Sequence, residues 1–123
     1  MKPAIVNMDL YRHATNSFKL IWLGGGVPVD LTGFNARLDF WVGQNLTTQT
    51  TFTANSFTNP ELFELTDQGE ITVHIPAYII DTIVEVVTDL CMEQNYSLNL
   101  LEPGQLIEDD GFRFCYGRAK VNP

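Results

Sequence analysis

The chain has 123 residues, a length that suits one domain over residues 1–123 and leaves little room for a second. Hydrophobic residues make up 45% of the chain and charged residues 18%, so we expect a packed core and not a disordered chain. The formal net charge of -8 argues against a nucleic-acid or anionic-membrane surface, because both kinds of surface need clustered lysine and arginine.

Apolar and polar residues alternate along much of the chain, and this period of two predicts β-strands. Strands with one buried and one wetter face are typical of antiparallel sheets packed on another layer. In chain order, the residues expected to point inward are Phe18, Leu20 and Trp22; Leu38, Phe40 and Val42; Ile71, Val73 and Ile75; Tyr96, Leu98 and Leu100; and Phe112, Phe114 and Tyr116.

Turn residues separate these strands. Gly24-Gly25-Gly26 predicts a tight hairpin, because glycine readily adopts the positive φ values that such a turn needs. Residues 44–57 are rich in Thr, Asn and Gln and predict a long loop or a solvent-exposed edge strand. Further turns are expected at Asp67-Gln68-Gly69, Pro103-Gly104 and Asp109-Asp110-Gly111. Several short strands with regular turns fit a sandwich better than alternating βαβ units.

Residues 76–92 are ambiguous between helix and strand. Asp81, Glu85 and Asp89 recur at i,i+4 spacing and Pro76 can open a helix at its first position, which favours a short helix connecting strands across the sandwich. The β-branched run within 83–87 resists a helix, and a strand there is the alternative. The three acidic residues also interrupt the apolar stretch, so it cannot span a bilayer.

The sequence offers no constellation for catalysis. His13 and His74 are the only histidines, and neither has a nucleophile or further metal ligands nearby in sequence. Gly24-Gly25-Gly26 lacks the Lys-Ser/Thr that completes a phosphate loop. Glu108-Asp109-Asp110 lacks the spaced ligands of a calcium loop and predicts a solvated turn, while Asp30 is expected to cap its own turn. We therefore predict no catalytic, cofactor-binding or metal-binding residue, and no cofactor.

The two cysteines and two sequon matches are not expected to have a chemical function. Cys91 and Cys115 are too few for a disulfide scaffold, and we expect both to be reduced and buried. Asn45-Leu46-Thr47 and Asn95-Tyr96-Ser97 match the glycosylation sequon, but Met1-Lys2-Pro3 does not begin a secretory signal, so these matches are interpreted as chance.

The order of strands and turns resembles a known structural module. Tyr11-Arg12 enters a strand, a glycine hairpin follows, and Pro28-Val29-Asp30-Leu31-Thr32-Gly33-Phe34 leads into Ala36-Arg37. Later segments continue the likeness: Gly69-Glu70-Ile71-Thr72-Val73, then Tyr96-Ser97-Leu98-Asn99-Leu100, then a closing strand from Arg113 through Gly117 to Val121. The layout is similar to that of the small Ig-like β-sandwich modules of tailed-bacteriophage virions, as found in baseplate and tail-associated proteins. His13-Ala14 departs from the Gly-Asp usual there, and the 79–91 connection is longer and more apolar.

With the strand pattern, the resemblance predicts an all-β fold: an Ig-like antiparallel β-sandwich of about seven strands with one short connecting helix. It implies a non-enzymatic structural or adaptor protein of a phage tail, baseplate or neck. Such a protein is assembled into the virion in the host cytoplasm and contacts other virion proteins and copies of itself. Neither nucleic acid nor a membrane is expected as a partner. Trp41, Ile21 and Leu101 are expected on outward strand faces, where a partner can cover them.

Two alternatives stay open at this point. A carbohydrate- or receptor-binding β-sandwich module would present aromatic and carboxamide side chains from residues 44–57. A small enzyme on a β-scaffold would need titratable groups that converge in space, which the sequence does not display.

Overall fold

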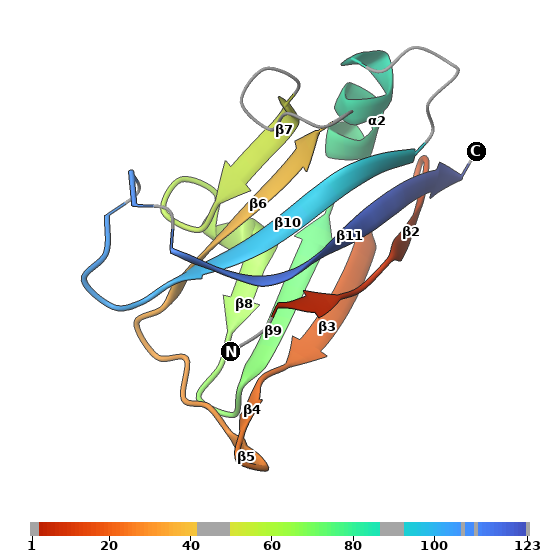
Figure 1. The fold of residues 1–123 in the computed structure, drawn as a ribbon. Coiled ribbons are helices and arrows are strands. Elements are labelled where there is room, and N and C mark those ends of the chain that lie inside the picture. Colours follow the sequence, from red (N-terminus) through yellow and green to blue (C-terminus); the bar gives the residue numbers. More distant parts are fainter. Residues whose placement is uncertain (1–2, 42–49, 87–92, 107, 110, 123) are drawn as a thin grey trace.

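Two β-sheets pack face to face in the computed structural model, which describes residues 3–41, 50–86, 93–106, 108–109 and 111–122 (Figure 1). The larger sheet has six strands and the smaller sheet has three. A two-stranded hairpin extends from one end of the sandwich, and a helix lies at the opposite end. The fold is all-β, as the sequence predicts.

The larger sheet has the order β1-β11-β10-β6-β7, and β2 also pairs with β11. The pairs among β6, β7, β10 and β11 are antiparallel, whereas β1 and β2 run parallel to β11. Its strands are β1 (Ala4–Ile5), β2 (Met8–Tyr11), β6 (Asn35–Trp41), β7 (Thr50–Asn55), β10 (Glu93–Leu101) and β11 (Phe112–Asn122).

The smaller sheet has the antiparallel order β3-β9-β8, formed by β3 (Asn16–Ile21), β9 (Glu70–Ile75) and β8 (Phe63–Leu65). The short hairpin consists of β4 (Leu23–Gly24) and β5 (Val27–Pro28). The helical elements are the 3-10 turn η1 (Pro60–Leu62) and the helix α2 (Ala77–Val86).

This arrangement is that of an immunoglobulin sandwich. In that fold, strands B, E and D form one sheet, and strands C, F and G form the other, which C′ extends in variable-type domains. Here β3, β9 and β8 occupy the positions of B, E and D, while β6, β7, β10 and β11 occupy those of C, C′, F and G. The topology therefore matches the Ig-like expectation strand by strand, apart from the placement of β1 and β2.

The core lies between the two sheets and follows the predicted alternation closely. In β9, Ile71, Val73 and Ile75 are buried while the residues between them are partly exposed. Leu38 and Phe40 of β6 lie beside Leu98 and Tyr96 of β10 on the inner face of the larger sheet, and Leu100 continues that face. Phe18, Leu20 and Trp22 pack against this core from the β3 side. Val42, the remaining predicted member, lies outside the described residues.

The predicted alternation along β11 is wrong after Phe114. Leu98 pairs with Cys115 but Asn99 pairs with Arg113, so Phe114 is an additional residue in this strand. Such a bulge exchanges the inward and outward faces. Phe112 and Phe114 contact Trp22 on the inside. Beyond the bulge Cys115 is fully buried, and Tyr116 is only partly buried, with Arg113 stacked 5.3 Å above its ring.

Two residues expected on wet faces are buried. Leu101 is only 1% exposed, and Gly111 lies close to it, since a Cβ added to Gly111 would be 3.1 Å from the Leu101 Cγ atom. Leu101 therefore gives no support for a partner surface. Asp39 is 2% exposed: Arg37 Nε lies 3.1 Å from one carboxylate oxygen, and Thr53 donates a hydrogen bond to the other at 2.6 Å.

Residues 77–86 form a helix, as favoured over the strand alternative, and residues 87–92 lie outside the described chain. Pro76 immediately precedes the helix, and its carbonyl accepts hydrogen bonds from the amides of Ile79 and Ile80. These two isoleucines are buried against the core. No helix in the described part of the chain is long and apolar enough to cross a membrane.

Candidate functional site

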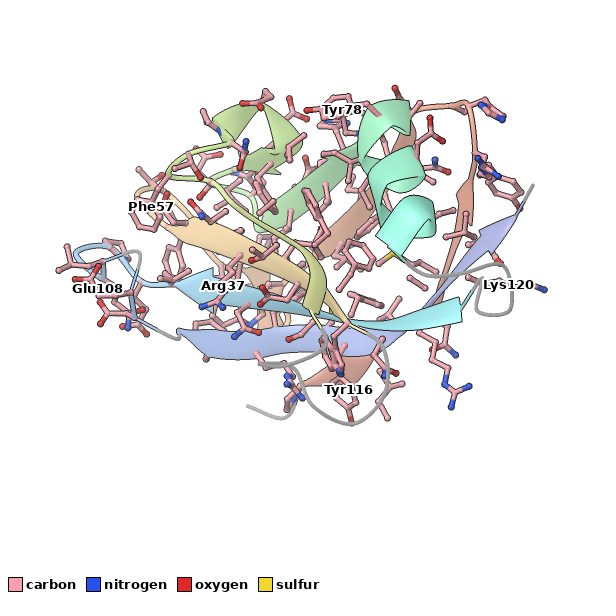
Figure 2. The ribbon with its side chains drawn as sticks, turned by 90° about the horizontal axis from the view of Figure 1, so that it is seen from above. Arg37, Phe57, Tyr78, Glu108, Tyr116 and Lys120 are labelled. Carbon is pink, nitrogen blue, oxygen red and sulfur yellow. The ribbon has the colours of Figure 1, made fainter. Side chains whose placement is uncertain are left out.

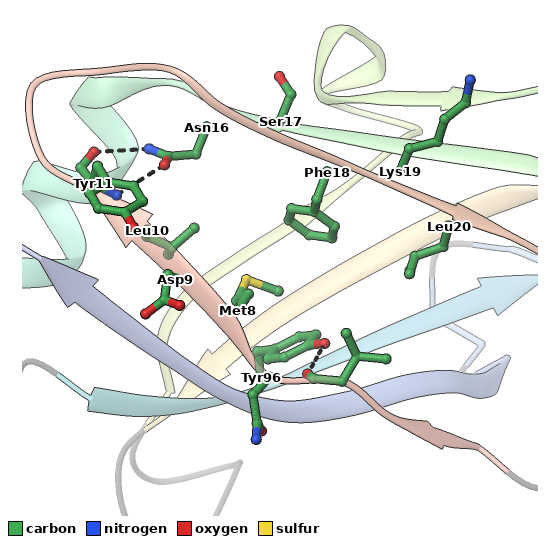
Figure 3. A pocket seen from close by; sticks show the side chains of 12 residues that line it. Met8, Asp9, Leu10, Tyr11, Asn16, Ser17, Phe18, Lys19, Leu20 and Tyr96 are labelled. Carbon is green, nitrogen blue, oxygen red and sulfur yellow. Dashed lines mark hydrogen bonds between the residues drawn. The ribbon is translucent and has the colours of Figure 1, made fainter.

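β3 separates two surface features that are candidates for function. On its inner side, a cavity of about 380 Å³ opens between β3 and β2 (Figure 3). On its outer side, polar side chains from β3, β9 and β8 form a hydrogen-bonded row. A third feature, an apolar hairpin, lies at the end of β3.

The cavity exists because the chain changes sheets between β2 and β3. Both strands line it, although β2 belongs to the larger sheet and β3 to the smaller one. Phe18 and Leu20 point into it, and Ser17 and Lys19 point away (Figure 3). Its apolar lining includes Met8 and Leu10 from β2, the two inward side chains of β3, and Tyr96 from β10. Asp9, Asn16 and Lys19 are polar residues at its margin.

The turn that joins β2 to β3 is fixed by side-chain hydrogen bonds. The Asn16 carboxamide accepts from the Tyr11 amide at 2.9 Å and donates to the Tyr11 carbonyl at 2.9 Å. His13 has a φ of 65°, the only positive φ of a non-glycine residue in the described chain. We therefore assign His13 to the backbone geometry of this turn.

Tyr96 ties the N-terminal segment to the back of the cavity. Its hydroxyl donates a hydrogen bond to the Val6 carbonyl and lies 3.9 Å from the Cys115 sulfur. Burial raises the pKa of the Tyr96 phenol well above its ordinary value, and the neighbouring Cys115 adds to the effect. Burial likewise raises the pKa of the Cys115 thiol. Both groups therefore stay protonated at neutral pH and act as structural groups, not nucleophiles.

The outer row joins Ser17, His74 and Glu64. The Ser17 hydroxyl lies 2.7 Å from His74 Nδ1, and Glu64 Oε2 lies 3.0 Å from His74 Nε2. Ser17 and His74 are directly opposite each other in the β3–β9 ladder. This grouping could not be predicted from the sequence, because alternation places Ser17 and His74 on outward faces but does not give the register between strands, and no strand is predicted at Glu64.

The chemistry open to this row is limited by its surroundings. A serine paired with a histidine and a carboxylate resembles the proton-transfer part of a hydrolase triad. Such a nucleophile also needs donors aimed at the developing oxyanion and a concave site that holds the substrate. The cavity lining includes Ser17 but neither His74 nor Glu64, and the Ser17 side chain points away from the cavity toward His74 (Figure 3). The Glu64 side chain is 65% exposed. We interpret the row as a cross-strand polar network that aligns β3, β9 and β8.

The β4–β5 hairpin presents apolar side chains to solvent. Ile21 and Leu23 before the turn and Val27 after it are 56%, 54% and 64% exposed. Gly25 and Gly26 have φ values of 61° and 82°, which a two-residue turn of this type requires. The predicted glycine hairpin is thus confirmed, and it projects from the end of the sandwich (Figure 1).

The acidic residues Asp30 and Asp109, which the sequence places in turns, make hydrogen bonds within those turns. Asp30 accepts hydrogen bonds from the Thr32 hydroxyl at 2.6 Å and the Thr32 amide at 2.9 Å, which lower the pKa of its carboxyl group. Its predicted role as a turn cap is confirmed. Asp109 accepts from the Leu106 amide within its turn. Among the residues described, no three His, Cys, Asp or Glu side chains are arranged to hold a metal ion.

Several predictions fall partly outside the described chain. Cys115 is a buried free thiol, as expected, whereas Cys91 is not among the described residues. Within 44–57, residues 50–55 form the edge strand β7, and residues 44–49 are not described. The first sequon is likewise outside the description, whereas Tyr96 and Ser97 of the second are buried in β10.

The exposed side chains form a mixed polar and apolar surface (Figure 2). Tyr78 of α2 and Phe57 after β7 are large exposed apolar residues, at 63% and 40%. No protein-family model matches the chain, and no curated protein matches it.

Proposed function

We propose that this protein is a structural or adaptor subunit of a bacteriophage virion, placed in the tail, baseplate or neck, and that it acts by protein–protein assembly. Two observations of different kinds support the proposal. The first is the likeness of its strand and turn segments to phage Ig-like modules. The second is the apolar β4–β5 hairpin, which carries the assembly role.

The hairpin supports assembly because of where its apolar residues lie. Ile21, Leu23 and Val27 are each more than half exposed at one projecting end of the sandwich. Single exposed apolar residues are common, but three near one end of the sandwich give a partner apolar surface to cover, with Leu23 and Val27 on opposite faces of the hairpin.

The direct test is the composition of the source particle. We expect mass spectrometry and cryo-electron microscopy of purified particles to find the protein in stoichiometric amounts, with several copies in defined positions. Each stable interface should bury at least about 1,000 Å². Absence of the protein from particles, or a copy that touches no neighbour, would refute the proposal.

A variant pair tests the part assigned to the hairpin. We expect Leu23→Asp combined with Val27→Asp to reduce incorporation into particles, because the charges oppose desolvation of the tip. The matched control is Tyr78→Asp combined with Phe57→Asp, which places the same two charges at exposed apolar residues outside the hairpin. Equal incorporation of both variants would show that the hairpin makes no assembly contact.

A further inference from the structure

We propose that the free edge of β3 is a docking site for an extended segment of a partner protein, which adds a strand to the smaller sheet. Alternate apolar side chains of this segment would enter the cavity between β2 and β3. The inference rests on the assembly function proposed above and gives the chemistry of one partner.

The position beside β3 is vacant in the described chain. Immunoglobulin sandwiches commonly place a strand A beside B in the B–E–D sheet. Here β1 and β2, which precede β3, both pair with β11 in the other sheet. Because residues 3–11 do not pair with β3, β3 is an edge strand that pairs with β9 alone among the described strands.

The backbone groups on this edge follow from the ladder. The Trp22 amide donates to the Gly69 carbonyl at 2.9 Å, which fixes the alternation of hydrogen-bonded pairs along β3 and β9. Ser17, Lys19 and Ile21 then direct their backbone N–H and C=O groups away from β9. A row of such groups is a template for another strand.

The cavity gives this edge its specificity. A strand added at the usual spacing of about 4.8 Å from β3 directs every second side chain toward the sandwich interior. In that direction lies the opening of about 380 Å³, lined by Met8, Leu10, Phe18, Leu20 and Tyr96. The geometry thus combines main-chain pairing with pockets for alternate side chains, the arrangement used in strand-addition complexes. It selects a segment that is apolar at every second position and polar between.

A second copy of this chain fits the site less well. Its own β3 could pair with this edge, but Phe18 and Leu20 of that copy pack against its own core and cannot fill the cavity. Each copy also carries a net charge of -8, which opposes close approach. An extended segment of another protein has both faces available, so it can pair and fill the cavity together.

Hydrogen exchange of the isolated protein tests the edge without a ligand. We expect the amides of Ser17, Lys19 and Ile21 to exchange much faster than those of Phe18 and Leu20, which pair with β9. Slow exchange at all five amides in a monomer would show that the edge is already paired and would overturn the inference.

A randomised twelve-residue peptide library, displayed on ribosomes, tests docking. We expect enriched peptides with apolar residues at alternate positions, which protect the amides of Ser17, Lys19 and Ile21 on binding. Lys19→Pro should weaken binding by about tenfold or more, because it removes an amide that faces the incoming strand. Lys19→Ala keeps that amide and should leave binding within about threefold.

A folding control and a second variant distinguish lost docking from a disrupted sheet. Exchange at the β9 amides shows whether Lys19→Pro has kept the sheet, and Met8→Trp, which fills the cavity from β2, should weaken binding without altering β3. Failure to enrich peptides, or equal binding by the Lys19→Pro and Lys19→Ala variants, would overturn the inference. A dimer that Lys19→Pro dissociates would identify a second copy as the occupant and overturn the choice of partner. These outcomes are independent of whether particles contain the protein, so the two proposals can fail separately.

Discussion

Replacing Phe40 by alanine should be among the most destabilising single changes in this chain. Phe40 is fully buried in β6, and its ring centroid lies 6.5 Å from that of Phe52 and 6.3 Å from that of Tyr96. Truncating a buried phenylalanine costs about 3–5 kcal/mol, and losing two ring contacts places this site in the upper half of that range. We expect a fall in melting temperature of about 10–20 °C.

Urea denaturation followed by tryptophan fluorescence measures the free energy of unfolding. The matched control is Phe57→Ala, which removes the same ring from a residue that is 40% exposed and should cost less than about 1 kcal/mol. Phe40→Leu supplies a milder change, at about 1–1.5 kcal/mol, if the alanine variant does not fold. Equal losses in Phe40→Ala and Phe57→Ala would mean that the inward face of β6 is assigned wrongly.

Three other experiments test separate parts of the structure: a substitution, a pH dependence and a labelling reaction. Gly117→Ala should lower the free energy of unfolding by about 1–3 kcal/mol and increase proteolysis of residues 4–11, because its methyl group would overlap the Val6 carbonyl. The control is Gly24→Ala, whose methyl group would make only an ordinary contact with Val29. Because burial raises the pKa of Cys115, the unfolded thiol loses its proton first, and the free energy of unfolding should fall as pH rises above the ordinary thiol range; a Cys115→Ala variant with the same alkaline slope would contradict this. A fluorophosphonate probe should leave Ser17 unlabelled, and labelling of native protein that is lost in His74→Ala would instead establish an active nucleophile.

Strands such as β3 and β9 could be predicted from this sequence because each keeps one alternating pattern from end to end. In β9, for example, Ile71, Val73 and Ile75 carry the whole inward face. β11 defeats the same reasoning, since Phe112, Phe114 and Tyr116 continue an alternation that the bulge at Phe114 interrupts. Nothing in the local sequence marks the bulge, because it depends on the pairing with β10.

The surface features depend even more on pairing between distant segments. Ser17 and His74 are 57 residues apart and meet only through the β3–β9 register. The vacant edge of β3 follows from the parallel pairing of β1 and β2 with β11, which no turn signal near the N-terminus specifies. Asp39 shows the converse case, in which an outward-facing carboxylate is buried by Arg37 and Thr53.

The pairing of the first strands with the last one also has a kinetic consequence. The hydrogen bond from the Arg118 amide to the Asn7 carboxamide joins residues separated by 111 positions, and Gly117 admits Val6 at the same place. During synthesis, residues 4–11 must therefore remain without their partner until β11 has left the ribosome. Contacts between such distant segments slow folding and prolong the exposure of unpaired strands. Truncation within β11 should thus release the N-terminal strands as well as the C-terminal one.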